Sequence, residues 1–128
     1  MLTSEVKNME LLHGVDLEQI GRFEALIEKE SFMTRIYTEE EQSLIRHAAY
    51  PAQKAAGMWS AKEAVSKAFG RGLFGMLPRE IEVIYLPSGQ PQIMLHGKAA
   101  ETYGEYRLAL SITHSEGTVL ASCIAYKE

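Results

Sequence analysis

The stretch Trp59–Gly75, WSAKEAVSKAFGRGLFG, joins a helical pattern to a run of glycines and decides between two folds. Gly70, Gly72 and Gly75 have the G-x-G-x-x-G spacing of a dinucleotide-binding loop. Such a loop follows a strand and opens a helix, so that the helix N-terminus faces the pyrophosphate. Here the glycines follow a helical pattern, which argues against a Rossmann fold. We expect Gly70 to end the helix, and the loop either turns the chain or lets a ligand approach its bare backbone.

The helix before the glycines is predicted from Pro51, which suits a first helical turn, to about Phe69. At about 100° per residue, one side carries an apolar stripe for the core, formed by Met58, Ala61, Val65, Ala68 and Phe69. Glu63 and Lys67 project from nearly the opposite side, with Ser66 at its edge. An exposed Glu–Lys pair at this spacing is common and contributes only about 0.3–0.5 kcal/mol. The pair alone therefore does not establish a functional site.

The predicted order is one strand, then helices, then a β-hairpin, a further helix and a second hairpin. Strands are predicted over Met9–Val15, Glu80–Leu86, Gln92–Leu95, Leu108–Thr113 and Thr118–Tyr126. Further helices are predicted over Leu17–Lys29, from Thr38 to about His47, and over Lys98–Tyr106. This order is typical of an α+β fold with a mainly antiparallel sheet packed against helices, not of alternating βαβ units.

The bulk composition limits the class of protein. The 128 residues are 46% hydrophobic, which fits a single globular domain, predicted over residues 9–128 after a polar N-terminal extension over residues 1–8. The net charge of −4 gives no indication of nucleic-acid binding, and no apolar run is long enough to cross a membrane. The single Cys123 lies in an apolar run, so we expect a buried, inert thiol and a cytoplasmic location.

Three carboxylates are candidates for a metal site. Asp16 stands where a strand is predicted to meet a helix, so it either caps that helix, with Gln19 at the N3 position, or binds a cation. Glu18 lies two residues further on, and in an extended turn it points the same way as Asp16. Mg²⁺ takes one or two protein carboxylates together with substrate phosphates, so Glu63 can be one of the ligands. Lys67 can then meet the phosphate charge.

Five ordered segments of the chain resemble the 4′-phosphopantetheinyl transferases. GVDLEQIGRFE (residues 14–24) and WSAKEAVSKAFGRG (residues 59–72) resemble the signature of that superfamily. Further similar segments are FMTRIYTEEE (32–41), SGQP (88–91) and SITHS (111–115). The short chain resembles the holo-acyl-carrier-protein synthase group in particular. The resemblance implies that group's α+β fold and a homotrimer with active sites between adjacent subunits.

The resemblance extends from about residue 9 to the C-terminus and implies a reaction. The phosphopantetheine arm of coenzyme A moves to a serine of apo-acyl carrier protein, which gives holo-acyl carrier protein and adenosine 3′,5′-bisphosphate. Asp16 and Glu63 are implied to hold Mg²⁺, and Lys67 to add positive charge at the pyrophosphate. Either Glu63 through a water or a metal-bound hydroxide deprotonates the serine. Glu18 is either a third ligand or a solvated acid in a first helical turn.

The family match also implies binding contacts. The expected coenzyme contacts are Ser66, Lys67, Gly70, Gly72, Thr113 and His114. A lone histidine is more often structural, and that alternative stays open for His114. The short group usually has Arg-Phe where this chain has Met58 and Trp59, so the contact of that arginine is missing.

Arg22 matches an arginine that the family uses to bind the acidic carrier protein, and Lys29 lies two turns further along the predicted helix. The alternative for both residues is simple solvation. Two other functions also stay open. One is a non-catalytic coenzyme A- or nucleotide-binding module, and the other is a structural trimer with a surface Glu–Lys pair.

Overall fold

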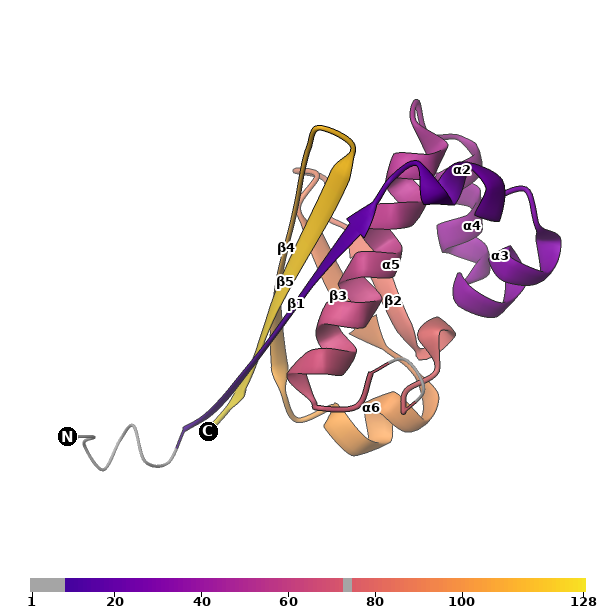
Figure 1. Ribbon diagram of the computed structural model, residues 1–128. Coiled ribbons are helices and arrows are strands. Elements are labelled where there is room, and N and C mark those ends of the chain that lie inside the picture. Colours follow the sequence, from indigo (N-terminus) through magenta and orange to yellow (C-terminus); the bar gives the residue numbers. More distant parts are fainter. Residues whose placement is uncertain (1–8, 73–74) are drawn as a thin grey trace.

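A long helix lies across an antiparallel sheet and forms the centre of the molecule (Figure 1). The computed structural model describes residues 9–72 and 75–128. The sheet consists of β1 (Glu10–Gln19), β5 (Thr118–Lys127) and β4 (Arg107–Ser115), in the order β1-β5-β4. Helix α5 (Pro51–Ala68) covers one face of this sheet and contacts mainly β1 and β5.

The remaining elements surround α5. Three short helices lie beside its N-terminal half (Figure 1): α2 (Arg22–Leu26), α3 (Glu30–Ile36) and α4 (Glu39–Arg46). The 3₁₀ turn η1 (Pro78–Glu80) leads into the hairpin of β2 (Ile81–Tyr85) and β3 (Pro91–Leu95), and α6 (Gly97–Tyr103) precedes β4. The predicted α+β class with antiparallel pairing is therefore confirmed. In the described part of the chain, no helix is long and apolar enough to cross a membrane. The predicted extension, residues 1–8, lies outside the described residues, and the single domain over residues 9–128 stays a prediction.

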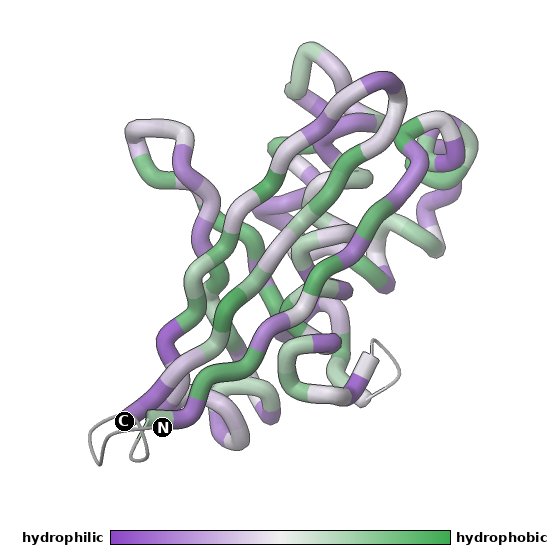
Figure 2. Tube along the Cα trace, turned by 60° about the vertical axis from the view of Figure 1, so that its left-hand side comes forward, coloured by the Kyte–Doolittle hydropathy of each residue, from purple (hydrophilic) through white to green (hydrophobic). Residues whose placement is uncertain are grey.

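Alternation along the strands places the core between the sheet and α5. The inward residues of β5 are small or β-branched and fully buried, namely Val119, Ala121, Cys123 and Ala125. Figure 2 shows this alternation of hydropathy along the three strands. Burial raises the pKa of the Cys123 thiol to about 12, so the thiol stays protonated and unreactive at neutral pH, as predicted.

Strand β1 crosses α5 at Gly14 with no side chain between the two backbones. A methyl group added at Gly14 would overlap the carbonyl oxygen of Ala64 and lie 2.5 Å from the amide nitrogen of Ala68. Only glycine permits such an approach, and it brings the residues that follow in β1 directly against the helix.

The predicted first helix begins too early. Asp16 was expected to cap a helix over Leu17–Lys29, but β1 continues to Gln19, and Asp16 pairs with Ala121 of β5. The ladder to β5 satisfies the backbone groups of this segment, so no cap is needed. The helical periodicity was misleading because the pairing partner lies about a hundred residues away in the sequence. Within the predicted range only α2 is helical, and α3, which begins at Glu30 after the extended Lys29, was not predicted.

Two helix boundaries are confirmed. The Thr38 hydroxyl accepts from the Glu41 amide at 3.2 Å, and the Glu41 carboxylate accepts from the Thr38 amide at 2.9 Å, which forms the capping box at the start of α4. At the end of α5, Gly70 adopts φ +70° and its amide donates to the Lys67 carbonyl, while the Arg71 amide donates to the Ser66 carbonyl. This Schellman motif ends the helix at the predicted residue.

Candidate active site

Asp16 lies on the inner face of β1, where it meets α5. Its side chain is only 6% exposed, and both carboxylate oxygens accept hydrogen bonds from the helix. Lys67 Nζ is 3.0 Å from Oδ1, and the Ser60 hydroxyl lies 3.1 Å from Oδ2 and 2.9 Å from the Asp16 carbonyl oxygen. Because these partners lie two turns apart on one face of α5, the helix holds the carboxylate in a fixed orientation.

Glu63 projects from α5 beside this pair and is half-buried. Burial and the neighbouring charge of Asp16 raise the pKa of Glu63, although Lys67 and Arg22 act in the opposite direction. The hydrogen bond to Asp16 raises the pKa of Lys67, so the ammonium group stays charged at neutral pH. Lys67 is therefore bound to Asp16 and is not simply the partner of an exposed Glu–Lys pair. The structure brings the three predicted residues together.

Glu18 follows on the same face of β1 but has different partners. Its Oε1 accepts from Arg22 at 2.8 Å, and its Oε2 accepts from the Trp59 indole at 3.2 Å. Burial, with the neighbouring Asp16, raises the pKa of Glu18 to about 7, while Arg22 and Trp59 lower it. Among residues 9–72 and 75–128, no three Asp, Glu, His or Cys side chains form a ready metal centre.

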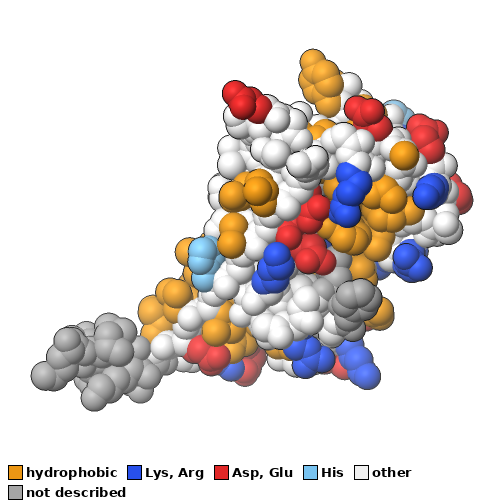
Figure 3. Space-filling model, in the orientation of Figure 1, with side chains coloured by type: hydrophobic (Ala, Val, Ile, Leu, Met, Phe, Trp, Pro, Cys, Tyr) orange, Lys and Arg blue, Asp and Glu red, His pale blue; other side chains and the backbone are white. Residues whose placement is uncertain are grey.

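The chemistry of the carboxylates fits a magnesium ion that also binds phosphate oxygens. Asp16 and Glu63 are close enough for the charge of Asp16 to raise the pKa of Glu63, so a cation between them would relieve their repulsion. Two carboxylates are the usual protein share of such a site. Figure 3 shows acidic side chains gathered on one face, with basic side chains on either side and an apolar area beside them. A phosphate group bound there would lie near both the acidic side chains that could hold Mg²⁺ and the basic side chains beside them.

The loop after α5 leaves open space beside its backbone. A Cβ atom added at Gly70 or at Gly72 would meet no other atom within 4 Å, and both residues have positive φ. The glycines are therefore required by the backbone conformation and not by close packing. They leave room for a ligand. Leu73 and Phe74 of the same stretch lie outside the described residues.

Ser66 does not lie where the sequence placed it. The side chain is fully buried, and its hydroxyl donates to the Lys62 carbonyl at 3.0 Å. A helix with one exposed side would carry Ser66 at the edge of that side. Helix α5 is instead enclosed by the sheet, the short helices and β2, so that polar residues such as Ser60 and Ser66 are buried as well. We therefore do not retain Ser66 as a coenzyme contact.

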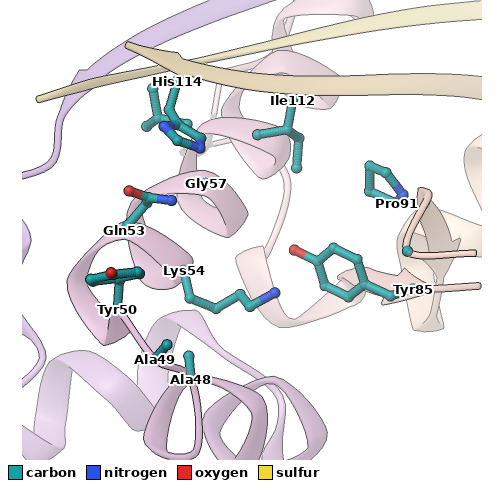
Figure 4. A pocket seen from close by; sticks show the side chains of 12 residues that line it. Ala48, Ala49, Tyr50, Gln53, Lys54, Gly57, Tyr85, Pro91, Ile112 and His114 are labelled. Carbon is teal, nitrogen blue, oxygen red and sulfur yellow. The ribbon is translucent and has the colours of Figure 1, made fainter. Parts of the chain in front are cut away.

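His114 lies in a separate pocket on the other side of α5 (Figure 4). The pocket has a volume of about 350 Å³. Glu18 pairs with Val119, and Val119 pairs with His114, so the Cα atoms of Glu18 and His114 lie roughly 10 Å apart. Gly57 of α5 packs over Val119 between them. Thr113 points to the opposite face of the sheet and is exposed.

Two further polar residues in this pocket were not predicted. Gln53 and Lys54 point into it from α5, and the Lys54 ammonium group lies 4.1 Å from the centre of the Tyr85 ring (Figure 4). Neither residue belongs to a recognisable motif. They meet His114 only because α5, the hairpin and β4 converge, which the sequence pattern does not indicate.

The two predicted carrier-binding residues lie on different elements. Arg22 begins α2 and its side chain is 54% exposed, with the guanidinium carbon 5.1 Å from the centre of the Phe23 ring and 5.9 Å from that of Trp59. Lys29 is exposed and directly precedes α3. The two residues therefore do not share one helix as expected.

Two carboxylates and a lysine, held where an edge strand crosses a long helix, define a site suited to chemistry at a magnesium-bound phosphate. The model of the 4′-phosphopantetheinyl transferase superfamily matches residues 13–119, and the chain belongs to this superfamily. It is 36% identical over 121 residues to a holo-[acyl-carrier-protein] synthase of Caldanaerobacter subterraneus, which covers 91% of this chain and 95% of the relative.

Solved structures agree with this assignment. The fold is similar to that of the holo-[acyl-carrier-protein] synthase of Neisseria meningitidis, with a TM-score of 0.79 and 32% identity over 89% of this chain and 96% of the other. It is equally similar to the Bacillus anthracis enzyme in complex with CoA (3′,5′-ADP), with a TM-score of 0.79 and 28% identity over 94% and 99% of the two chains. The expected family fold is confirmed, and the chain is an enzyme of the phosphopantetheinyl transferase class.

Proposed function

We propose that this protein transfers the 4′-phosphopantetheine arm of coenzyme A to a serine of apo-acyl carrier protein, giving the holo-carrier and adenosine 3′,5′-bisphosphate. The observation that carries the proposal is the contact of Lys67 with Asp16, 3.0 Å long, beside the half-buried Glu63. The relatives named as holo-[acyl-carrier-protein] synthases support the choice of substrates.

Asp16 and Glu63 are the residues that would hold Mg²⁺, which supplies charge neutralisation at the pyrophosphate when bound. Lys67 places a second positive charge there and stays protonated, because its pKa is raised. Glu63 is also suited to accept the serine proton through a water, since its raised pKa lies closer to neutrality than that of a free carboxylate. Positioning and charge, rather than covalent catalysis, then lower the barrier.

The coenzyme is proposed to lie between subunits of a homotrimer. His114 and the carboxylates lie on opposite sides of α5, so one ligand meets both most readily when each comes from a different subunit. The outer face of the sheet supports self-association, because it exposes apolar side chains: Leu11, Val15, Leu17 and Ile124. The backbone at Gly70 and Gly72 would pass beside the coenzyme. Thr113 lies on the outer face of the sheet, and its contact with the coenzyme stays a prediction.

Arg22 and Lys29 are proposed to meet the acidic carrier protein. Both are exposed, Arg22 as the first residue of α2 and Lys29 just before α3, on the side of the molecule where the short helices lie. Basic groups on this surface would steer an acidic partner, and the binding would weaken as salt is added. The cytoplasmic location stays a prediction.

Intact mass measurement tests the transfer directly. The protein is mixed with coenzyme A, Mg²⁺ and an apo-acyl carrier protein, and the carrier is expected to gain the mass of one phosphopantetheine group. Omission of coenzyme A and addition of EDTA are the controls. If coenzyme A binds but the carrier mass does not change, the protein is a binding module and not a transferase.

A further inference from the structure

Glu18 is engaged on both carboxylate oxygens by side chains of its own chain. Arg22 Nη2 is 2.8 Å from Oε1, and Trp59 Nε1 is 3.2 Å from Oε2. The Glu18 side chain is only 16% exposed, so water does little to compete for these contacts. To bind a metal as well, Glu18 would have to share or release these donors. Asp16 and Glu63 already provide the carboxylates that Mg²⁺ usually takes from a protein.

The same contacts orient Arg22. One guanidinium nitrogen is bound to Glu18, and the group lies near the rings of Phe23 and Trp59, at 5.1 and 5.9 Å from their centres. Yet the Arg22 side chain is 54% exposed. A guanidinium group has five N–H donors in a rigid plane, so donors remain free for a second carboxylate while the first one fixes the plane. An arginine held in this way loses less conformational entropy on binding than a freely rotating one.

We propose that Glu18 and Trp59 are positioning residues that hold Arg22 ready for a carboxylate of the acidic carrier protein, and that Glu18 is not a third metal ligand. The inference rests on the proposed function through the carrier-facing role of Arg22. It also gives Trp59 a function that phenylalanine at the same position could not perform, because only the indole carries an N–H group.

A double-mutant cycle tests this inference, with Glu18→Gln, Arg22→Gln and the double variant. Binding of apo-carrier protein is measured by calorimetry with Mg²⁺ and adenosine 3′,5′-bisphosphate present, and half-saturating Mg²⁺ is measured separately. Glu18→Gln is expected to weaken carrier binding about fivefold, the size typical of one partly exposed ion pair. The KM for carrier should rise, while kcat, the KM for coenzyme A and half-saturating Mg²⁺ stay unchanged. In the Arg22→Gln background, Glu18→Gln should have no further effect.

Two controls separate positioning from other roles. Glu24→Gln removes the same charge from α2 and leaves the Glu18–Arg22 pair in place, so carrier binding should change less than for Glu18→Gln. Trp59→Phe keeps an aromatic ring but loses the N–H donor. It should weaken carrier binding when Arg22 is present and have no effect in the Arg22→Gln background. Trp59 is the only tryptophan, so its fluorescence emission should shift in Glu18→Gln and not in Glu24→Gln.

The inference is overturned if half-saturating Mg²⁺ rises severalfold in Glu18→Gln, because Glu18 is then a ligand. It is also overturned if Glu18→Gln weakens carrier binding equally in both backgrounds, or if the wild type binds no carrier. The proposed function has a different criterion, namely the mass of the carrier after reaction. A wild type that modifies the carrier without the expected coupling keeps the function and loses the inference.

Discussion

At the scale of single residues, the site depends on groups whose protonation is set by their neighbours. Lys67 is held charged by Asp16, whereas burial and the charge of Asp16 make Glu63 and Glu18 weaker acids than free carboxylates. Acids and bases shifted in this way are typical of sites that handle charged substrates.

Glu63→Gln is expected to reduce the rate of transfer by at least about a hundredfold, because it removes both a charge for Mg²⁺ and the proposed base. The fold should persist, since Glu63 is half-buried and lies outside the apolar core. Carrier mass and circular dichroism are the measurements. A variant that is folded and fully active at ordinary Mg²⁺ would exclude Glu63 from both roles.

The stability of the metal-free protein should depend on pH through Glu18. Burial, with the neighbouring Asp16, raises the pKa of Glu18 from 4.5 to about 7 in the folded state. A carboxyl group whose pKa is higher in the folded state than in the unfolded state binds its proton more tightly when the protein is folded. Its contribution to stability is fully present below pH 4.5 and is lost as the pH rises through about 7. In EDTA, the Tm is therefore expected to fall over this range.

Glu18→Gln provides the control for this pH dependence, because the amide does not titrate. The fall in Tm should become shallower but not vanish, since the pKa of Glu63 is also raised. An identical pH profile for variant and wild type would show that Glu18 titrates normally.

At the scale of elements, α5 is fixed by a buried ion pair that lies next to the site. Lys62 Nζ donates to Glu41 of α4 at 2.8 Å and to the carbonyl oxygens of Pro78 and Ile81 at 2.8 and 2.6 Å. Both charged side chains are completely buried. Glu41 also accepts from the amides of Thr38 and Val83. One network thus joins α5 to α4 and β2, immediately beside Glu63.

Lys62→Met is expected to lower the free energy of unfolding by about 3–5 kcal/mol, because it leaves the Glu41 carboxylate buried without its cation. Urea unfolding measures the change. The double variant Lys62→Met with Glu41→Gln should be more stable than Lys62→Met alone, since no charge is then left unpaired. A loss below about 0.5 kcal/mol in the single variant would mean that water reaches Glu41.

The elements differ in how far the sequence predicts them. Helix α5, its Gly70 cap and the capping box at Thr38 follow from local spacing, and so they are predicted correctly. The end of β1 depends on pairing with β5, which local spacing does not contain. Lys62 lies next to the apolar stripe of α5, four residues after Met58 and three before Val65, and this spacing indicates that its side chain is buried. That a lysine can be fully buried there depends on partners from three other segments.

At the scale of the whole molecule, sequence pattern alone does not bring Asp16 to Lys67, 51 residues away. Only the family resemblance joined the two, and the structure gives the contact its distance. Sequence pattern does not indicate the pocket of His114 either, because α5, β4 and the hairpin each contribute part of its lining. The assembly of subunits into a homotrimer stays a proposal.

Mixed oligomers test whether a site is shared between subunits. Glu63→Gln and His114→Ala each damage a different half of the proposed site, so co-expression of the two variants should restore part of the transfer activity. Restoration is expected because some interfaces then combine two intact halves. Leu17→Arg is the control, since it places a charge on the outer face of the sheet, where Leu17 is 62% exposed. It should abolish restoration and shift sedimentation towards the monomer.

Absence of restoration from a stable mixed oligomer would place both halves of the site in one subunit. Restoration in the Leu17→Arg background would show that subunits meet through another surface.

The crossing of β1 and α5 at Gly14 has a consequence for engineering. The backbones of β1 and α5 are in direct contact at Gly14. The distance between Asp16 and Glu63 is therefore fixed by a strand and a helix and not by a flexible loop. Helices α2 and α3 pack on the core through the buried side chains of Phe23, Met33 and Ile36, while most of their other residues are exposed. A chimera that keeps the crossing and these three buried residues, and exchanges only the exposed residues between 22 and 36, would therefore change the choice of partner while the reacting groups keep their spacing. Recognition and chemistry can be altered separately in this fold.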